Sequence, residues 1–230
     1  MNQIKTGIDC IDAQLLGGIT PETLTLIYGE PETGKSTIAL QCAVNCALQN
    51  RKVLFVDCDN TFSAKRLSQV AGDRFDEVSD RIILVKPKDF REQTAFIDCI
   101  QEYTANVGLI IVDTFTSLYG AQVAEASGKA FMINRELNRQ LAILAQTVKT
   151  KKIPVLITSQ VRSILNDQNP SVRPVATRVL KFWADNIIAI KPTEDHRVLK
   201  AILEKPHEDE TEKVCYVQIG ESGIKDTQFH

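Results

Sequence analysis

The chain contains 230 residues, of which 43% are hydrophobic and 24% are charged, and its formal net charge is −2. This composition favours a single α/β domain, residues 1–230, and excludes a disordered chain or an overall basic surface, so any nucleic-acid contact must come from a local patch. No apolar run approaches the ~20 residues that cross a bilayer, and residues 1–5 lack the apolar core of a signal peptide. We therefore expect a cytoplasmic protein that does not enter a membrane.

Hydrophobic periodicity predicts strands that alternate with helices along most of the chain. The first segment, 6–18, reads as a short amphipathic helix that ends at Gly17 and Gly18. Further helices are predicted at 38–50, 63–72, 90–105 and 129–150, and strands at 24–28, 53–57, 82–85, 108–113, 153–160, 187–190, 198–203 and 214–219. Residues 161–181 read as a loop. The links between the last three strands are too short for crossover helices, so the pattern predicts a doubly wound, mainly parallel sheet with antiparallel C-terminal strands.

The most informative motif is the P-loop pattern G-x-x-x-x-G-K-S/T, which lies between the first predicted strand and the helix that follows it. In this arrangement the backbone N–H groups of the loop and the helix N-terminus point at a phosphate. Lys35 is expected to reach the β- and γ-phosphates, the Ser36 hydroxyl to ligate Mg²⁺, and Thr37 to hold the α-phosphate. The motif therefore predicts a nucleoside-triphosphate site at Gly29, Glu30, Pro31, Glu32, Thr33, Gly34, Lys35, Ser36 and Thr37.

A second motif places a carboxylate beside the P-loop. The strand 108–113 carries four apolar residues followed by Asp113, which is the Walker B pattern of a central parallel strand. Because the carboxyl ends of parallel strands lie at one edge of a sheet, we expect Asp113 to hold the shell of the Mg²⁺ ion that Ser36 ligates. Together the two motifs predict a nucleoside triphosphate and Mg²⁺ as cofactors.

The cysteines and histidines show no metal-binding pattern. The histidines are isolated, and the cysteines have no C-x-x-C spacing, so neither set resembles a zinc site. We interpret the cysteines as small core residues in a reducing compartment rather than as a metal or redox site. They are Cys10, Cys42, Cys46, Cys58, Cys99 and Cys215.

Taken in order, these segments resemble the core of the RecA-type recombinases, and within them the archaeal RadA/RadB group and its eukaryotic relatives. The resemblance rests on segments 6–18, 29–37, 56–62, 111–116, 157–161 and 219–226. It begins without the N-terminal helical domain that RadA carries ahead of this core, which is typical of the RadB paralogues. Such paralogues bind ATP and DNA, hydrolyse ATP poorly, and assist recombination and repair rather than drive strand exchange.

The resemblance implies roles for three further residues. Asp59 falls on the position of the catalytic Glu and would act with Lys35 in hydrolysis, but its side chain is one methylene shorter. This shortening displaces the carboxylate by about 1 Å, and a misplacement of that size can cost ~10²-fold in rate. Arg66 falls on the residue that lies over the adenine, the alternative being a solvated helix charge. Gln160 falls on the residue that senses the γ-phosphate, the alternative being an amide that hydrogen-bonds the backbone at the end of its strand.

The resemblance also places two DNA-binding loops. The first, 119–128, is arginine-rich in the recombinases but here has Glu125 as its only charged residue. The second, 162–181, carries four cations against one carboxylate, Asp167. Unless it is a solvated basic loop, it is the expected contact for the phosphates of single-stranded or branched DNA, without sequence selectivity. The four cations are Arg162, Arg173, Arg178 and Lys181.

The leading hypothesis is an ATP-binding accessory of DNA repair and recombination of RadB type, with weak, DNA-independent ATPase activity. One alternative is an active strand-exchange ATPase, which the short Asp59 side chain and the poor first loop disfavour. Another is a KaiC-like signalling ATPase that does not bind DNA, which the Asn60-Thr61-Phe62 context disfavours. A RadA-type recombinase is the expected protein partner. Homo-oligomerisation stays open, as does the role of Lys205, which is either a surface lysine or a ligand for the γ-phosphate of a neighbouring subunit.

Overall fold

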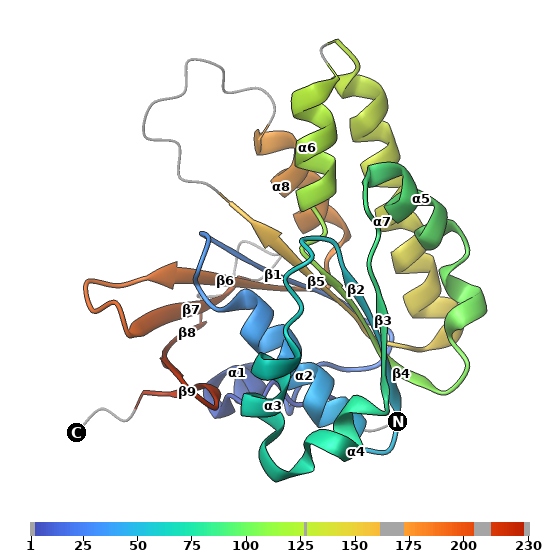
Figure 1. Cartoon of the computed structure of the whole chain (residues 1–230). Helices are drawn as coiled ribbons and strands as arrows, with labels where there is room; N and C mark the ends of the chain where they lie inside the picture. Colours follow the sequence, from blue (N-terminus) through green and yellow to red (C-terminus); the bar gives the residue numbers. More distant parts are fainter. Residues whose placement is uncertain (1–2, 127, 162–172, 205–212, 228–230) are drawn as a thin grey trace.

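A computed structural model of the chain describes residues 3–126, 128–161, 173–204 and 213–227, and for 173–175 the backbone alone. In these residues the strands form one sheet in the order β3-β2-β4-β5-β1-β6-β7-β8-β9, with helices on both faces (Figure 1). The order of the strands in the sheet differs from their order along the chain, because helical connections link strands that are not neighbours in the sheet.

The strands divide into a parallel part and an antiparallel part. The parallel strands are β1 (Leu24–Gly29), β2 (Lys52–Asp57), β3 (Ile82–Val85), β4 (Val107–Asp113), β5 (Val155–Gln160) and β6 (Asn186–Pro192). The antiparallel strands are β7 (Val198–Glu204), β8 (Lys213–Gly220) and β9 (Gly223–Asp226). The predicted α/β fold, with a mainly parallel sheet and antiparallel C-terminal strands, is confirmed. The sequence did not indicate β9 as a strand.

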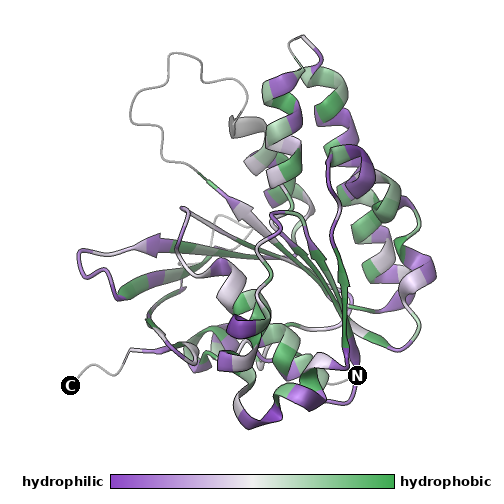
Figure 2. Ribbon diagram, viewed as in Figure 1, coloured by the Kyte–Doolittle hydropathy of each residue, from purple (hydrophilic) through white to green (hydrophobic). Residues whose placement is uncertain are grey.

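Each face of the sheet has its own set of helices and its own hydrophobic core. One core lies under α1 (Asp9–Gln14), α2 (Lys35–Leu48), α3 (Ala64–Ala71) and α4 (Phe75–Ser79). The other lies under α5 (Phe90–Asp98), α6 (Ser117–Glu125), α7 (Ala130–Lys151) and α8 (Arg173–Trp183). Figure 2 shows the apolar residues concentrated in the strands between these two layers. Within the described part of the chain, every helix is too short or too polar to cross a membrane.

Local sequence explains where these elements begin. All seven residues of β4 are buried, as expected for a central parallel strand covered on both faces. Helix α3 begins after Ser63, whose hydroxyl accepts a hydrogen bond from the backbone N–H of Arg66 at 3.2 Å. Helix α5 begins after Asp89, whose carboxylate accepts from the N–H of Glu92 at 2.7 Å. Both are N-caps, which satisfy backbone donors that the helix itself leaves free.

The register of the parallel strands brings the motifs to one edge of the sheet. Asp57 of β2 pairs with Asp113 of β4, and Gly29 of β1 pairs with Gln160 of β5. The P-loop, the Walker B carboxylate and the γ-phosphate-sensing position predicted from the sequence therefore meet at the carboxyl ends of adjacent strands. This is the edge where open α/β sheets bind ligands.

Three predicted segments differ from the structure. The prediction of a loop up to Lys181 is wrong, because α8 begins at Arg173. Segment 119–128 is largely helical, since α6 runs to Glu125 and the buried Tyr119 donates a hydrogen bond to Asn134 at 2.5 Å. The predicted helix 6–18 is shorter, with α1 ending at Gln14.

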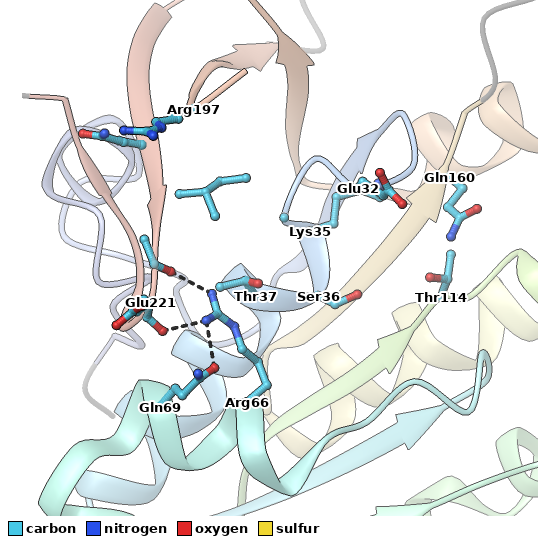
Figure 3. A pocket seen from close by; sticks show the side chains of 14 residues that line it. Glu32, Lys35, Ser36, Thr37, Arg66, Gln69, Thr114, Gln160, Arg197 and Glu221 are labelled. Carbon is cyan, nitrogen blue, oxygen red and sulfur yellow. Dashed lines mark hydrogen bonds between the residues drawn. The ribbon is translucent and has the colours of Figure 1, made fainter. Parts of the chain in front are cut away.

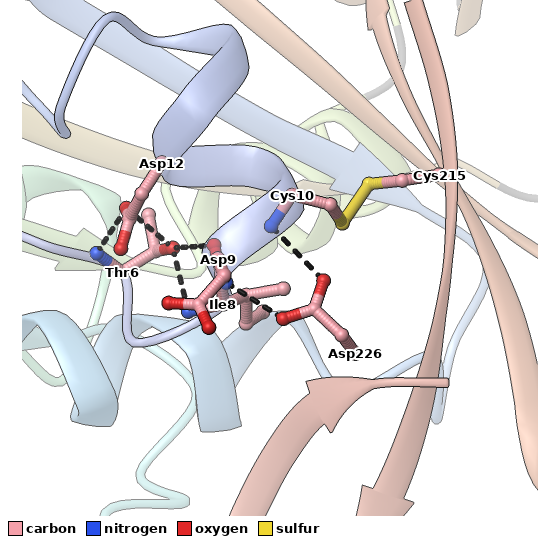
Figure 4. Close-up of a disulfide and its surroundings, with 7 residues drawn as sticks. All are labelled: Thr6, Ile8, Asp9, Cys10, Asp12, Cys215 and Asp226. Atoms are coloured by element: carbon pink, nitrogen blue, oxygen red, sulfur yellow. Dashed lines mark hydrogen bonds between the residues drawn. A yellow bond between two sulfur atoms is a disulfide. The ribbon is translucent and has the colours of Figure 1, made fainter. Parts of the chain in front are cut away.

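The interpretation of all six cysteines as reduced is also wrong. Cys10 of α1 and Cys215 of β8 form a disulfide with a Cα–Cα distance of 6.2 Å (Figure 4). Next to it, the carboxylate of Asp226 accepts hydrogen bonds from the backbone N–H groups of Asp9 and Cys10 at 2.7 and 3.0 Å. The disulfide and these two hydrogen bonds hold α1 against the C-terminal strands β8 and β9. The other four cysteines are free, and Cys42, Cys46 and Cys58 are buried as expected.

Candidate functional site

A cavity of about 950 Å³ opens at the carboxyl edge of the sheet (Figure 3). The P-loop and the start of α2 form its floor, and the ends of β4 and β5 contribute Thr114 and Gln160 on one side. On the other side lie Arg66 of α3, the β6–β7 turn with Arg197, and the turn between β8 and β9. A cleft of this size, with a few converging polar groups, has the properties of a small-molecule site.

The P-loop backbone fits a phosphate group. Gly34 is the N-cap of α2 with φ +75°, and no side chain caps the helix there. A Cβ at Gly34 would lie 2.5 Å from the side chain of Ile224, and a Cβ at Gly29 would lie 2.2 Å from the carbonyl oxygen of Ile190. Both glycines are therefore required by close packing, and the N-terminus of α2 remains available to an anion.

Lys35 brings a largely buried cation to the same place, with 5% of its surface exposed. Its ammonium donates hydrogen bonds to the carbonyl of Glu30 and, at 3.2 Å, to the hydroxyl of Thr33. Burial lowers the pKa of Lys35 from 10.5 to about 8, against the opposing attraction of Asp113, Asp59 and Glu30. Added negative charge, such as a polyphosphate, would favour the protonated ammonium.

Asp113 and Ser36 provide oxygen ligands for a cation. Asp113 is buried, and its carboxylate accepts hydrogen bonds from the hydroxyls of Thr158 and Ser36. Burial raises the pKa of Asp113 above its usual value, and these hydrogen bonds act in the opposite direction. Carboxylate and hydroxyl oxygens are the donors that Mg²⁺ prefers, so these residues fit a Mg²⁺ ion bound with phosphates.

Asp59 lies near this pair and is half-buried. It is close enough for its charge to raise the pKa values of both Lys35 and Asp113. Among the described residues, its carboxylate makes no hydrogen bond or ion pair. Gln160 is exposed at the end of β5 and lines the cavity, and its side chain is likewise unbonded within the described residues.

Arg66 forms part of the opposite wall, as Figure 3 shows. Its guanidinium donates to the carbonyls of Gly220 and Glu221 at 3.1 and 2.6 Å, and to the side chain of Gln69 at 3.2 Å. These bonds hold the guanidinium between α3 and the β8–β9 turn. Arg66 is therefore not an unattached solvated charge, which was the alternative interpretation of this residue.

The structure describes the side chains of only two of the four cations predicted to contact DNA. Arg162 and the side chain of Arg173 lie outside the described residues, and Arg178 is exposed on α8. The ammonium of Lys181 instead donates hydrogen bonds to the carboxylate of Glu204 and to the hydroxyl of Tyr28. The prediction that Lys181 lies in a loop is therefore wrong, because it lies on α8, and its ammonium is paired with a carboxylate. Its predicted contact with DNA stays a prediction. Lys205 also lies outside the described residues.

Sequence reasoning missed part of the cavity wall. Arg197, Gln218 and Glu221 line the cavity, and they come from the antiparallel strands and the turns between them. Such turns carry no phosphate-binding motif, so nothing in the local sequence indicates that they face a ligand. Pairing with β7 brings them to the P-loop, because Val198 pairs with Gln218 and the N–H of Ile219 donates to the carbonyl of Arg197.

Comparison with known proteins decides the family. The family model described as Rad51 matches residues 1–227. The chain is 32% identical over 219 residues to the DNA repair and recombination protein RadB of Methanobrevibacter smithii, which covers 93% of this chain and 92% of that protein. The chain belongs to the RadB group of the Rad51 family. It is also 32% identical over 229 residues to RadB of Thermococcus kodakarensis, covering 98% of this chain and 100% of that protein.

A solved structure described as that of the RadB recombinase has the same fold, with a TM-score of 0.78 and 30% identity over 98% of this chain and 100% of that one. The predicted resemblance to the RecA-type recombinases and the RecA-like fold are therefore confirmed. Proteins of the RecA/Rad51 family are ATPases that use ATP with Mg²⁺.

Proposed function

We propose that this chain binds ATP with Mg²⁺ in the P-loop pocket, hydrolyses it slowly, and acts as an accessory in DNA repair and recombination. The observation that carries the proposal is the meeting of four groups at the P-loop. The buried ammonium of Lys35 and the hydroxyl of Ser36 line the cavity, and the carboxylates of Asp113 and Asp59 lie close enough to Lys35 to affect its pKa. Membership of the RadB group supports the proposed role in DNA repair and recombination.

Each side chain would have a distinct task. Lys35 and the N-terminus of α2 would bind the β- and γ-phosphates, with Thr37 at the α-phosphate. Bound through Ser36 and Asp113, Mg²⁺ would neutralise phosphate charge during transfer. Asp59 would orient the attacking water, and Gln160 would contact the γ-phosphate.

Slow turnover follows from the length of one side chain. The family pattern has a Glu where this chain has Asp59. The shorter side chain keeps the charge but places it about 1 Å from the position that aligns the water, and such a displacement can cost ~10²-fold in rate. Binding would be nearly unaffected, because the shorter side chain keeps its negative charge near Lys35 and Asp113, and Lys35, Ser36 and Asp113 would bind the nucleotide and the ion.

DNA binding would rest on the basic segment that leads into α8. Arg162, Arg173 and the exposed Arg178 would neutralise backbone phosphates without reading bases, so affinity would fall with salt and be insensitive to sequence. Lys181 is paired with Glu204, and segment 119–128 has no arginine, so fewer cations are available for DNA than the resemblance to the recombinases implies. We therefore propose that this chain assists a RadA-type recombinase in the cytoplasm.

Thermal unfolding with and without millimolar Mg-ATP tests the nucleotide assignment. Ligand that binds only the folded state raises stability by RT ln(1 + [L]/Kd), so wild type should melt at a higher temperature with ATP and Lys35→Ala should not. The same two proteins, titrated with single-stranded DNA and then assayed for strand exchange, separate an accessory from a strand-exchange enzyme. A folded wild type that shows no shift with Mg-ATP would refute the nucleotide assignment.

A further inference from the structure

Three polar side chains from distant parts of the chain meet on the face of the sheet that carries α8. The ammonium of Lys181 donates hydrogen bonds to the Glu204 carboxylate and, at 2.8 Å, to the Tyr28 hydroxyl, while that hydroxyl donates to the other oxygen of Glu204. The ammonium also lies 4.5 Å from the centre of the Tyr28 ring, a cation–π contact. We call these three residues the Lys181 cluster. It is half-buried, since 34% of the Lys181 side chain and 21% of the Glu204 side chain are exposed.

The Lys181 cluster joins three elements that matter for the site. Tyr28 lies in β1 directly before Gly29, where the P-loop begins. Glu204 ends β7, and Lys181 lies in the last turn of α8, the helix that follows segment 162–172. The cluster therefore fixes the end of α8 against two strands, one of which leads directly to the nucleotide pocket.

The cluster also determines which way Arg178 points. Residues three apart on a helix lie on neighbouring parts of its surface, so holding Lys181 against the sheet sets the rotation of α8 and with it the direction of Arg178. Leu180 is buried in the core beneath, and Trp183 donates to Asn138 of α7 at 2.9 Å. Leu180 and Trp183 hold α8 against the core and against α7. The Lys181 cluster adds side-chain hydrogen bonds from α8 to β1 and β7.

We propose that Lys181, Glu204 and Tyr28 are positioning residues for DNA binding, which orient α8 so that the exposed Arg178 faces the DNA phosphates. This inference rests on the proposed function, because it presumes that DNA binds this basic surface. It differs from the sequence-based prediction, in which Lys181 itself contacts DNA. The two roles predict opposite effects of changing Glu204. A carboxylate near a phosphate-binding lysine opposes DNA, whereas a carboxylate that anchors the helix supports DNA binding.

The test compares single-stranded DNA affinity at several salt concentrations for wild type, Lys181→Met, Glu204→Gln and the double variant. Lys181→Met and Glu204→Gln should each weaken DNA binding about fivefold or more. The double variant should bind DNA about as tightly as the single variant with the lower affinity, because the two substitutions remove the same interaction. The slope of log affinity against log salt should be unchanged in Lys181→Met, whereas Arg178→Ala should flatten it by about 1. Tyr28→Phe should weaken binding less, because it keeps the ring.

Two controls separate positioning from misfolding and from general loss of charge. Each variant should keep the wild-type thermal shift with Mg-ATP, and Lys191→Met, at an exposed lysine of β6, should bind DNA as wild type does. Hydrogen exchange of the amides of residues 176–183, without DNA, should be faster in Lys181→Met and Glu204→Gln.

The outcomes are distinct. If Glu204→Gln binds DNA more tightly and Lys181→Met flattens the salt slope by about 1, Lys181 is a phosphate contact and the positioning role is overturned. Variants that bind DNA as wild type does also overturn it. If wild type itself binds no DNA, the proposed DNA binding and this inference both fail, whereas unchanged exchange in α8 with normal DNA binding by wild type removes the inference alone.

Discussion

Lys86 holds Asp57 at the end of β2, its ammonium lying 3.4 Å from the carboxylate. That carboxylate also accepts hydrogen bonds from the backbone N–H groups of Thr61 and Phe62, both at 3.0 Å. Asp57 is therefore committed to shaping the turn after β2. Asp59, two residues further on, makes no such bond among the described residues and lies close enough to Lys35 to influence its charge. Of the two carboxylates in this short segment, Asp59 is therefore the one that the proposed hydrolysis can use.

The first prediction concerns the length of the Asp59 side chain. Asp59→Glu should raise kcat for ATP hydrolysis, by as much as ~10²-fold, because it restores the reach needed to orient water, while ATP affinity stays nearly unchanged. Asp59→Asn should lower whatever turnover wild type has. Single-turnover hydrolysis at saturating Mg-ATP measures all three proteins.

Asp57 supplies the matched control for this experiment. Asp57→Asn leaves one of the partly buried backbone N–H groups of Thr61 and Phe62 poorly paired and removes the ion pair with Lys86, so it should lower the free energy of unfolding by about 1–3 kcal/mol, without the rate gain of Asp59→Glu. If wild type already turns over several ATP molecules per second, or if Asp59→Glu is no faster, the position of this carboxylate does not limit hydrolysis.

The second prediction is a pH dependence of nucleotide binding. Burial lowers the pKa of Lys35 to about 8, so in the free protein the ammonium loses its proton as the pH rises through that value. Since the protonated form binds the phosphates, Mg-ATP affinity should be constant below about pH 8 and fall by up to about tenfold per pH unit above it. Calorimetric titrations between about pH 7 and 9.5 measure the effect.

Lys35→Arg is the control, because a guanidinium stays protonated throughout this range. At neutral pH its affinity for Mg-ATP should be lower than that of wild type, because the planar guanidinium is larger than the lysine ammonium and places its N–H donors differently. Above about pH 8 it should show no further decline. A wild type whose affinity is flat to about pH 9.5 would show that Lys35 does not titrate in this range.

The parts of the site that the sequence predicted are those with local patterns. Lys35 and Ser36 belong to a contiguous motif, and Asp113 ends an apolar run, so strand register alone brings them together. The pairs Asn169-Pro170 and Arg173-Pro174 favour a loop before Lys181 in a prediction from sequence. However, proline is tolerated in the first turn of a helix, and α8 begins there. The apolar face that anchors α8, which includes Leu180, depends on tertiary packing that a loop assignment ignores.

The remaining differences involve pairs of residues far apart in the sequence. Cys10 and Cys215 are 205 positions apart, and they meet because β8 pairs antiparallel with β7 beside α1. Spacing alone cannot give such a partner. The same holds for Lys181, because Glu204 reaches it from the end of β7. A charge count over segment 162–181 has no information about a carboxylate outside that segment.

The third prediction concerns the disulfide. The disulfide between Cys10 and Cys215 restricts almost the whole unfolded chain. For a loop of about 205 residues, the loss of entropy in the unfolded state is expected to stabilise the folded protein by about 5 kcal/mol. Cys10→Ser should therefore lower the free energy of unfolding by about 2–5 kcal/mol. Adding dithiothreitol should destabilise wild type to the same extent and leave Cys10→Ser unchanged. Denaturant unfolding with and without reductant measures this.

Cys99→Ser is the matched control, because Cys99 is a partly exposed free cysteine. It should unfold as wild type does under oxidising conditions and lose stability with dithiothreitol, as wild type does. Equal stability of wild type and Cys10→Ser, with or without reductant, would show that this disulfide does not stabilise the fold.

The last prediction concerns Arg66. Its guanidinium bridges α3 and the carbonyls of Gly220 and Glu221, on the side of the cavity away from Thr114 and Gln160 (Figure 3). If the guanidinium contacts the base, Arg66→Ala should weaken the binding of ATP and of ADP equally, by about 5- to 30-fold. The reason is that a cation–π contact contributes about 1–2 kcal/mol to the binding free energy. Fluorescence titrations with both nucleotides measure the two affinities.

Two substitutions separate the effects of charge and shape at this position. Arg66→Lys should recover little of the lost affinity, because an ammonium cannot stack on a base and bridge two carbonyls as the planar guanidinium does. Lys65→Ala, which removes an exposed charge from the same helix, should leave both affinities unchanged. A loss seen with ATP and not with ADP would instead place Arg66 near the γ-phosphate. If Arg66→Lys binds both nucleotides as tightly as wild type does, net charge rather than stacking is what the nucleotide senses at this wall of the cavity.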